Sequence, residues 1–368
     1  MKKSICIVGP VGNYHIIKWS HNFVERGYDV HIVTLEKGRI EKCFVHYLGE
    51  TASTNDPEYK KIKYLFKAFE IRKIISKINP NIISVHYASS YGSLVALSGI
   101  HGYNLSIWGS DIYDFPRKSF FHKMLIMYSL WSARKLLSTS QCMAKEAAKY
   151  TKKSFAITPF GVNTDLFTPN SEMYSNKKYN TKNGKSFLIG TIKGLEDKYG
   201  IKYLLLAAAK LRKQYADIPL QIRIAGKGSK ESEYKKLATE LGLDDCLVWL
   251  GYISQAEAAK EWAKMDVGII YSESESKSFG VSAVEANACE TAVIVSDIPG
   301  LRESTVPGVS SYVVEKKNAD KLYEALVFLW KNPKIRISLG ENGRENVLKK
   351  YKIKNTFDTI ESELYKIR

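Results

Sequence analysis

The sequence lacks the cysteine pattern of a disulfide-rich or zinc-binding protein. Its five cysteines are odd in number, widely scattered and never arranged as C-x-x-C. Disulfide frameworks and structural zinc sites both require paired or closely spaced thiols, so neither class of protein is indicated. A reducing cytoplasm is the compartment that fits this cysteine usage.

Long hydrophobic runs and low-complexity tracts are also missing. No window approaches the roughly 18 consecutive apolar residues of a membrane span, and the short apolar run after Met1 to Lys3 is read as a strand rather than a secretion signal. With 45% hydrophobic and 25% charged residues, the 368-residue chain should fold throughout. Its length favours two domains of roughly 150 to 200 residues each.

Acidic residues are too few to balance the basic ones. The chain contains 55 Lys and Arg residues but 38 Asp and Glu residues, which gives a net charge of +17. Such a surface attracts polyanions, so nucleic acid, anionic lipid and phosphorylated substrates all qualify as partners. The alternative is a lysine-biased composition whose side chains are simply solvated.

Short β-rich runs alternate with helical periodicity, the pattern of βα units around a parallel sheet. The first group of predicted strands comprises Ser4–Gly9, Asp29–Thr34, Cys43–Leu48, Asn81–Tyr87, Asn104–Gly109 and Lys135–Ser140. The second comprises Phe187–Ile192, Gln221–Gly226, Leu247–Ile253, Val267–Ser272 and Ala292–Asp297. The polar segment 168–185 between them has the composition of an exposed linker. We therefore predict an α/β protein with two Rossmann-like domains, 1–167 and 186–349, which bind ligands at the carboxyl ends of their strands.

Two predicted strand-to-helix turns are candidate binding sites. Gly12 belongs to a glycine turn after the first strand, where the backbone can approach a ligand closely, although a purely structural turn would look the same. The stronger signal is the segment Tyr271–Asp297, in which a polar strand end is followed by a turn at Gly280 and a new helix. A helix start offers N–H groups and a positive dipole end to an anion. Glu285 on that helix is placed to accept hydrogen bonds from a ribose, and a solvated glutamate is the alternative.

The same segment carries a family resemblance. Ser-x-Ser-Phe-Gly-x(4)-Glu-Ala-x-Ala-Cys resembles the signature region of family-four glycosyltransferases, retaining enzymes with the GT-B fold. Further segments match that family in its order along nearly the whole chain: Trp108–Asp111, Pro159–Phe167, Gly190–Gly200 and Ile224–Gly228. The resemblance implies two Rossmann-like domains facing across a cleft, an N-terminal one for the acceptor and a C-terminal one for the nucleotide-sugar. It also implies that the helix 350–368 returns to the N-terminal domain.

The resemblance assigns residues to the donor site. Lys198 and Lys193 would contact the donor diphosphate, since a departing nucleoside diphosphate needs cationic partners. Glu285 would bind the nucleotide ribose. Further donor contacts are expected at Gly12, Gly190, Gly226, Tyr252, Phe279, Gly280 and Val281.

In the first domain, Asp111 follows a predicted strand and is a candidate for contacting an acceptor hydroxyl or the donor sugar. His15 and His86 also lie at predicted strand ends and are acceptor-binding candidates, although packing histidines would occupy similar places.

Two positions depart from the family pattern. The first glutamate of the family's E-x(7)-E motif is replaced by Lys277, eight residues before Glu285. Lys277 is therefore assigned to the catalytic site as a variant, with Glu275 as a substitute carboxylate if the loop is slipped. The family's frequent His-Gly appears as Trp108-Gly109, so a histidine contact to the sugar is missing there.

Two basic segments, Lys60–Lys77 and Arg117–Lys135, combine lysines with large apolar residues. Both can lie against anionic lipid, as basic amphipathic helices do. The alternative is a pair of sheet-packing helices with solvated lysines.

Together with these features, the resemblance implies a metal-independent retaining glycosyltransferase without a cofactor. It would move a sugar from a UDP- or GDP-linked donor to a glycan or lipid-linked acceptor in surface polysaccharide synthesis. We expect it in the cytoplasm, at the inner face of the cell membrane, with no nucleic-acid partner. The alternatives are a nucleotide-sugar epimerase of the same architecture and a non-catalytic nucleotide-binding subunit, the latter because of Lys277.

Overall fold

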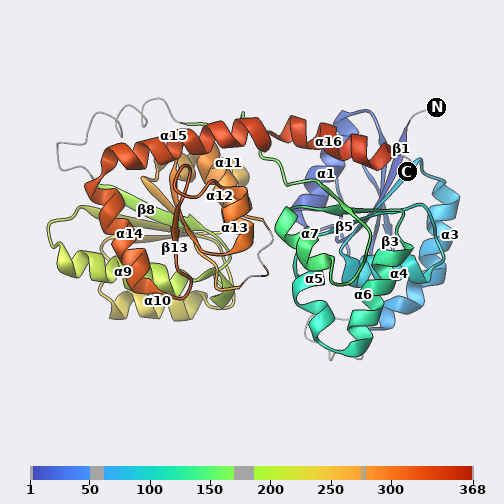
Figure 1. Ribbon diagram of the computed structural model, residues 1–368, viewed down its shortest axis with the longest axis horizontal. Coiled ribbons are helices and arrows are strands. Elements are labelled where there is room, and N and C mark those ends of the chain that lie inside the picture. Colours follow the sequence, from blue (N-terminus) through green and yellow to red (C-terminus); the bar gives the residue numbers. More distant parts are fainter. Residues whose placement is uncertain (1–2, 50–61, 170–185, 275, 277–278, 367–368) are drawn as a thin grey trace. The chain divides into compact units, whose positions relative to one another are not determined.

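The chain divides into two compact units (Figure 1). The computed structural model describes residues 3–49, 62–169, 186–274, 276 and 279–366. Unit 1 comprises Met1–Pro159 and Phe357–Arg368, and unit 2 comprises Phe160–Thr356. Most of the predicted linker, from 170 to 185, lies outside the described residues.

Unit 1 contains a seven-stranded sheet in the order β3-β2-β1-β4-β5-β6-β7. Every strand pair in it is parallel. Its strands are β1 (Ser4–Val8), β2 (Asp29–Thr34), β3 (Phe44–Tyr47), β4 (Ile82–His86), β5 (Asn104–Ile107), β6 (Lys135–Ser138) and β7 (Phe155–Ile157). The six predicted strands are confirmed. Strand β7 was not predicted, because three half-buried residues at a sheet edge leave almost no period-two signal.

The helical elements of unit 1 connect these strands. They are α1 (Tyr14–Glu25), η1 (Ile62–Lys67), α3 (Ala68–Ile78), η2 (Ala88–Gly92), α4 (Ser93–Leu97), α5 (Ser110–Tyr113), η3 (Phe115–Arg117), α6 (Phe120–Ser132) and α7 (Gln141–Ala147). The predicted basic helix 60–77 is a 3-10 turn followed by α3, with 60 and 61 outside the described residues. Within the described part of the chain, no helix is long and apolar enough to cross a membrane.

The C-terminal helix α16 (Ile353–Tyr365) returns to unit 1, as predicted (Figure 1). Phe357 packs edge-on against Trp19 and Phe23 of α1, with ring centroids 5.9 and 6.1 Å apart. Arg26, at the end of α1, pairs with the carboxylates of Asp358 and Glu361, each at 2.7 Å. Aromatic burial and charge pairing therefore both hold the end of the chain on α1.

Unit 2 is built around a second parallel sheet of six strands in the order β10-β9-β8-β11-β12-β13. Its strands are β8 (Phe187–Ile192), β9 (Leu220–Ala225), β10 (Leu247–Gly251), β11 (Val267–Ile270), β12 (Ala292–Ser296) and β13 (Tyr312–Val314). The five predicted strands are confirmed, and the short edge strand β13 was not predicted. The helical elements are η4 (Asp197–Tyr199), α9 (Ile201–Gln214), α10 (Glu231–Glu240), α11 (Gln255–Lys264), α12 (Val281–Ala288), α13 (Pro299–Ser304), α14 (Ala319–Lys331) and α15 (Pro333–Lys350).

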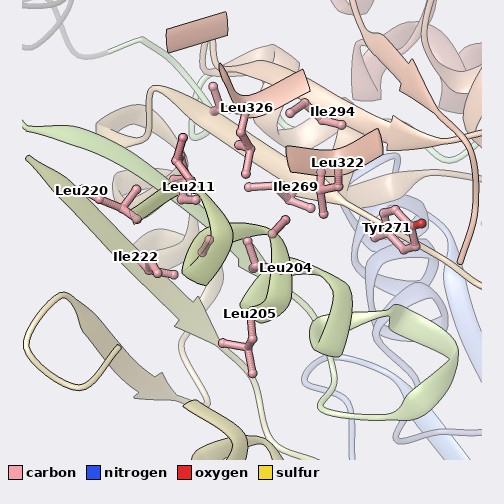
Figure 2. Packing of buried hydrophobic residues seen from close by; sticks show 14 of the residues in the cluster. Leu204, Leu205, Leu211, Leu220, Ile222, Ile269, Tyr271, Ile294, Leu322 and Leu326 are labelled. Carbon is pink, nitrogen blue, oxygen red and sulfur yellow. The ribbon is translucent and has the colours of Figure 1, made fainter. Parts of the chain in front are cut away.

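The core of unit 2 lies between its sheet and the helices α9 and α14. Figure 2 shows Leu204 and Leu211 of α9 and Leu322 of α14 among the strand residues Ile222 and Ile294, all of them buried. Strand β11 is buried along its whole length, as expected for a parallel strand covered on both faces. This packed core positions the carboxyl ends of the strands, where the candidate donor residues lie.

Candidate functional site

The loops that follow β8 and β9 are locked together by backbone hydrogen bonds. The N–H of Lys193 donates to the carbonyl of Ala225 at 2.9 Å, and the N–H of Leu195 donates to the carbonyl of Lys227 at 3.1 Å. The N–H of Gly226 donates to the carbonyl of Gly251 at 2.7 Å, which joins the loop after β10 to the same structure. Three loops thus form one continuous backbone surface at the carboxyl edge of the sheet, the edge where open α/β sheets bind ligands.

Glycine is required where these loops cross. Gly226 has a φ of +137°, and a Cβ there would lie 1.8 Å from the carbonyl oxygen of Lys193. A Cβ on Gly228 would lie 2.3 Å from the carbonyl oxygen of Leu195. Both close contacts are with backbone, which cannot rotate away, so a larger residue would separate the loops. Gly190, by contrast, lies inside β8, where a Cβ would meet the carbonyl of Arg223 at 2.1 Å, so it allows neighbouring strands to pack.

The two candidate diphosphate-binding lysines meet at one aromatic ring. The ammonium nitrogens of Lys193 and Lys198 lie 5.5 and 5.2 Å from the ring centroid of Tyr199. Lys198 belongs to η4, and its carbonyl accepts a hydrogen bond of 3.0 Å from the N–H of Glu273, in the segment after β11. Two positive charges are therefore held beside the glycine loops, where they can bind a diphosphate.

Helix α12 starts next to the end of β8. The hydroxyl of Ser282, in the first turn of α12, donates to the carbonyl of Ile192, the last residue of β8, at 3.4 Å. Gly280 caps the helix and packs closely, since a Cβ there would lie 2.5 Å from the hydroxyl oxygen of Ser304. The first N–H groups of a helix have no acceptor within the helix, so those of Gly280 and Val281 are suited to a phosphate oxygen.

The ring of Phe279 anchors this turn. It is buried against Phe160 and Tyr351, with centroids 6.2 and 5.4 Å away. A ligand can therefore meet Phe279 only through its backbone.

Glu285 lies one helical turn after Val281 and is 7% exposed. Residues three and four apart share a helix face, so Glu285 lies on the side that Ser282 presents to the end of β8. A nearly buried carboxylate at this place is suited to a directed hydrogen bond with a hydroxyl rather than to solvation. Lys277 and Glu275 lie outside the described residues.

Tyr252 extends into solvent from the loop after β10. Its side chain is 79% exposed, and the preceding Gly251 accepts the hydrogen bond from Gly226. An exposed aromatic ring on a fixed loop can stack on a nucleobase.

In unit 1, Asp111 is buried and holds the backbone around it. Its carboxylate accepts hydrogen bonds from the N–H groups of Ala88 at 2.9 Å, Gly109 at 2.8 Å and Trp108 at 3.2 Å. Burial raises the pKa of Asp111 above its ordinary value, although these N–H donors act in the opposite direction. The donor residue Ala88 follows Tyr87, whose φ of +71° is unusual for a tyrosine. The geometry makes Asp111 a positioning residue for the ends of β4 and β5.

The two candidate histidines differ in exposure. His86 is fully buried, with its ring 4.5 Å from that of Trp19 and 5.0 Å from that of Trp108. Burial, with a smaller effect of His15, lowers the pKa of His86 to about 3, so its ring is neutral near pH 7. His15 is half-buried in the first turn of α1, 5.6 Å from the ring of Trp108. Gly12, just before α1, is exposed, and its N–H donates to the carboxylate of Glu36 at 3.3 Å.

Three residues of the unit 2 site were not identified from the sequence. Tyr199 contacts both lysines, and Lys227 is exposed between the two crossing glycines. Glu196 accepts hydrogen bonds from the N–H and hydroxyl of Ser229 at 2.8 and 2.6 Å, which fastens the two loops together. All three lie in segments that resemble the family, Gly190–Gly200 for Glu196 and Tyr199 and Ile224–Gly228 for Lys227, but the resemblance did not assign them a role. Within the described residues, no group of three or more His, Cys, Asp or Glu side chains is arranged to hold a metal ion.

Two family models match the chain. The model described as glycosyl transferases group 1 matches residues 174–346. The model described as glycosyl transferase 4-like matches residues 4–140.

Curated relatives carry glycosyltransferase names. A D-inositol 3-phosphate glycosyltransferase of Arthrobacter sp. is 30% identical over 215 residues, which is 56% of this chain and 50% of that protein. An N-acetyl-alpha-D-glucosaminyl L-malate synthase of Bacillus anthracis is 22% identical over 358 residues, covering 91% of this chain and 89% of that protein. The chain spans about half the length of the first of these relatives.

Solved structures share the whole fold. A sucrose-phosphate synthase of Thermosynechococcus elongatus superposes with a TM-score of 0.79 at 19% identity, covering 99% of both chains. HepE of Anabaena, solved with UDP-glucose, has a TM-score of 0.78 at 14% identity, covering 98% of this chain and 99% of that one. The fold is thus the GT-B fold that the family resemblance implied. With matches to family models in both halves, the chain belongs to the group 1, glycosyl transferase 4-like family of glycosyltransferases.

Proposed function

We propose that the protein transfers a sugar from a nucleoside-diphosphate sugar to a glycan or lipid-linked acceptor, with retention of configuration and without a metal ion. The observation that carries this proposal is the convergence of Lys193 and Lys198 on Tyr199, beside loops that glycines allow to cross closely at the carboxyl edge of the sheet. Membership of the glycosyltransferase family and the UDP-glucose complex of HepE support a nucleotide-sugar donor.

In this proposal the donor lies along the carboxyl edge of the unit 2 sheet. The lysine ammonium groups and the N–H groups of Gly280 and Val281 bind the diphosphate. Glu285 accepts hydrogen bonds from the ribose, and Tyr252 lies against the base. The donor is UDP- or GDP-linked.

The lysines also supply the chemistry. Negative charge develops on the leaving diphosphate as the sugar departs, and fixed positive groups aimed at that charge lower the barrier. For a retaining enzyme of this family the expected step is front-face attack, in which the leaving phosphate takes the acceptor's proton, so no side-chain base is needed.

Unit 1 binds the acceptor in this proposal. Asp111 acts indirectly, by fixing the backbone at Trp108 and Gly109, and the half-buried His15 ring lies 5.6 Å from that of Trp108. His86 supports the same cluster from within the core.

The sequence difference at Lys277 favours one competing function, a nucleotide-binding subunit without turnover. Thermal stabilisation by UDP and GDP should identify the base, because a ligand that binds only the folded state raises the apparent stability. Incubation with UDP- and GDP-sugars, with and without an acceptor, then separates the functions. Acceptor-dependent release of nucleotide that survives EDTA is expected. Conversion of the donor without acceptor would indicate an epimerase, and binding without any product would indicate a non-catalytic subunit.

A further inference from the structure

Helix α6 has two apolar faces, and only one of them is covered. Its inner face, with Leu125, Ile126 and Leu130, is buried in the core of unit 1. Its outer face exposes six large side chains: Phe120, Phe121, Met124, Met127, Tyr128 and Trp131. Phe120 is 78% exposed and Trp131 is 69% exposed. Contiguous apolar surface of this kind marks an interaction site rather than a solvated helix.

The outer face borders a groove. Four of its side chains, Met124, Met127, Tyr128 and Trp131, form one wall, and the segment 148–153 forms the other. The groove has a volume of about 790 Å³. We call it the α6 groove.

The walls of the α6 groove are fastened to each other. The ammonium group of Lys153 donates to the carbonyls of Leu130, Trp131 and Ala133, the last at 2.6 Å. This arrangement satisfies carbonyl groups at the end of α6 and places a positive charge at the negative end of the helix. On the other wall, the Tyr128 and Trp131 rings stack at 6.0 Å, and the Tyr128 hydroxyl donates to the carbonyl of Ala96 at 3.4 Å. The groove is therefore a built feature of unit 1.

The surroundings of the groove are strongly basic. Between 117 and 153 the only acidic residue is Glu146, which already pairs with Arg117 and Lys149. The same stretch contains nine basic residues: Arg117, Lys118, Lys123, Arg134, Lys135, Lys145, Lys149, Lys152 and Lys153. Lys149, Lys152 and Lys153 line the groove, whereas Lys135 is buried and pairs with Glu363. An occupant of the groove must therefore be apolar in one part and anionic in another.

We propose that the outer face of α6 docks on an anionic phospholipid bilayer and that the α6 groove takes up a lipid acyl chain. Phe120, Met124 and Trp131 would enter the boundary between headgroups and chains, where tryptophan is favoured. Lys123 and Lys152 would lie at the headgroup phosphates, with their stems along the apolar surface. The docking does not depend on sugar transfer.

Charge argues against a protein occupant. A symmetric contact with a second copy would place each basic rim against the other, in a chain of net charge +17. Lysine is also depleted from protein interfaces, where arginine is preferred, and the cations that line the groove are Lys149, Lys152 and Lys153.

Cosedimentation of the full chain with vesicles tests the proposal. Vesicles of phosphatidylglycerol and phosphatidylcholine should bind the protein, pure phosphatidylcholine much less, and salt should weaken the binding. Trp131→Ser should weaken binding by about tenfold or more, given the apolar area lost. The double variant Lys123→Gln, Lys152→Gln should weaken it by roughly fivefold per lysine.

Matched substitutions elsewhere should have no effect. Phe44→Ser removes another exposed aromatic ring of unit 1, and the double variant Lys213→Gln, Lys334→Gln removes two exposed charges of unit 2. Loss of binding in these controls equal to that in the α6 variants would overturn the assignment to α6. Equal, negligible binding to both kinds of vesicle would overturn the docking itself.

Fluorescence tests insertion separately from charge. Vesicles with brominated acyl chains should quench the tryptophan fluorescence of the wild-type protein more than that of the Trp131→Phe variant. The difference in quenching reports on Trp131 alone. Binding without that difference would mean that the contact is purely electrostatic and would contradict acyl-chain uptake. A concentration-dependent dimer that Trp131→Ser abolishes would instead identify a second copy as the occupant.

Discussion

The carboxylate of Glu361, near the end of the chain, accepts a hydrogen bond of 2.5 Å from the hydroxyl of Tyr28. The same carboxylate pairs with Arg26 at 2.7 Å. These contacts attach α16 to the end of α1 and the start of β2, so the fold of unit 1 includes residues from both ends of the sequence.

This attachment should be sensitive to acid. Burial raises the pKa of Glu361, but the hydrogen bonds from Tyr28 and Arg26 outweigh it and lower the pKa below the ordinary 4.5. A carboxylate whose pKa is lowered by folding stabilises the protein at pH values above its pKa in the unfolded state. This stabilisation is lost as the pH falls through its pKa in the folded state. The free energy of unfolding should therefore fall below about pH 4.5 as Glu361 is protonated.

Glu361→Gln should be less stable than wild type at pH 7, by roughly 1.5 to 3 kcal/mol for hydrogen bonds to a charged group. Urea unfolding of both proteins between pH 7 and pH 3 provides the measurement. The difference in the free energy of unfolding between wild type and variant should shrink toward acid pH. A difference that stays constant with pH would show that the charge of the Glu361 carboxylate does not contribute to stability.

Gly226 should tolerate no side chain. Gly226→Ala places a Cβ against the carbonyl of Lys193 at a φ of +137°, and we expect it to lower the free energy of unfolding by roughly 3 kcal/mol and to weaken nucleotide binding. Gly242→Ala is the control, because Gly242 has a φ of +67° but nothing within 4 Å of the added Cβ. Strain alone should cost that variant about 1 to 2 kcal/mol. Similar losses of stability and of nucleotide affinity in Gly226→Ala and Gly242→Ala would show that the close crossing of the loops at Gly226 is not essential.

Removal of single donor-site charges should weaken nucleotide binding without unfolding the protein. Lys198→Ala and Glu285→Ala should each lower the affinity for the preferred nucleoside diphosphate by roughly tenfold or more, the value of a hydrogen bond to a charged group. Lys202→Ala removes an exposed lysine from the next helix and should leave the affinity unchanged. Calorimetric titration provides the comparison, and unchanged affinity in both site variants would remove the assignment.

Lys277 tests the departure from the family pattern. If the protein is an active variant, Lys277→Glu restores the family's carboxylate and should preserve or raise the rate of transfer. Glu275→Ala should lower the rate only if Glu275 has taken over that role. A wild type that binds nucleotide without turnover, together with an active Lys277→Glu, would establish the non-catalytic function. Loss of an existing activity in Lys277→Glu would instead make the lysine part of the working site.

The sequence determined the architecture because most of its signals are local. Runs such as Val267–Ile270 predict buried parallel strands without knowledge of their neighbours. Gly280 stood out because it turns the chain between a strand and a helix, and Gly226 because its segment resembles that of the family. Short edge strands such as β7 and β13 were missed, since three residues contain too little periodicity to distinguish them from loop.

Only the tertiary structure decided what surrounds each candidate residue. Asp111 looked like a ligand contact, but its carboxylate is occupied by the N–H of Ala88, 23 residues earlier, and by its own neighbours. Helix α6 shows the same limit on its surface. The segment Arg117–Lys135 combines lysines with large apolar residues, so its sequence allowed either lipid contact or packing on the sheet. Its periodicity contains no information about which side the rest of the chain leaves uncovered. The exposure of Trp131 and the Lys153 contacts that fasten the groove depend on where distant residues pack, which no local pattern specifies.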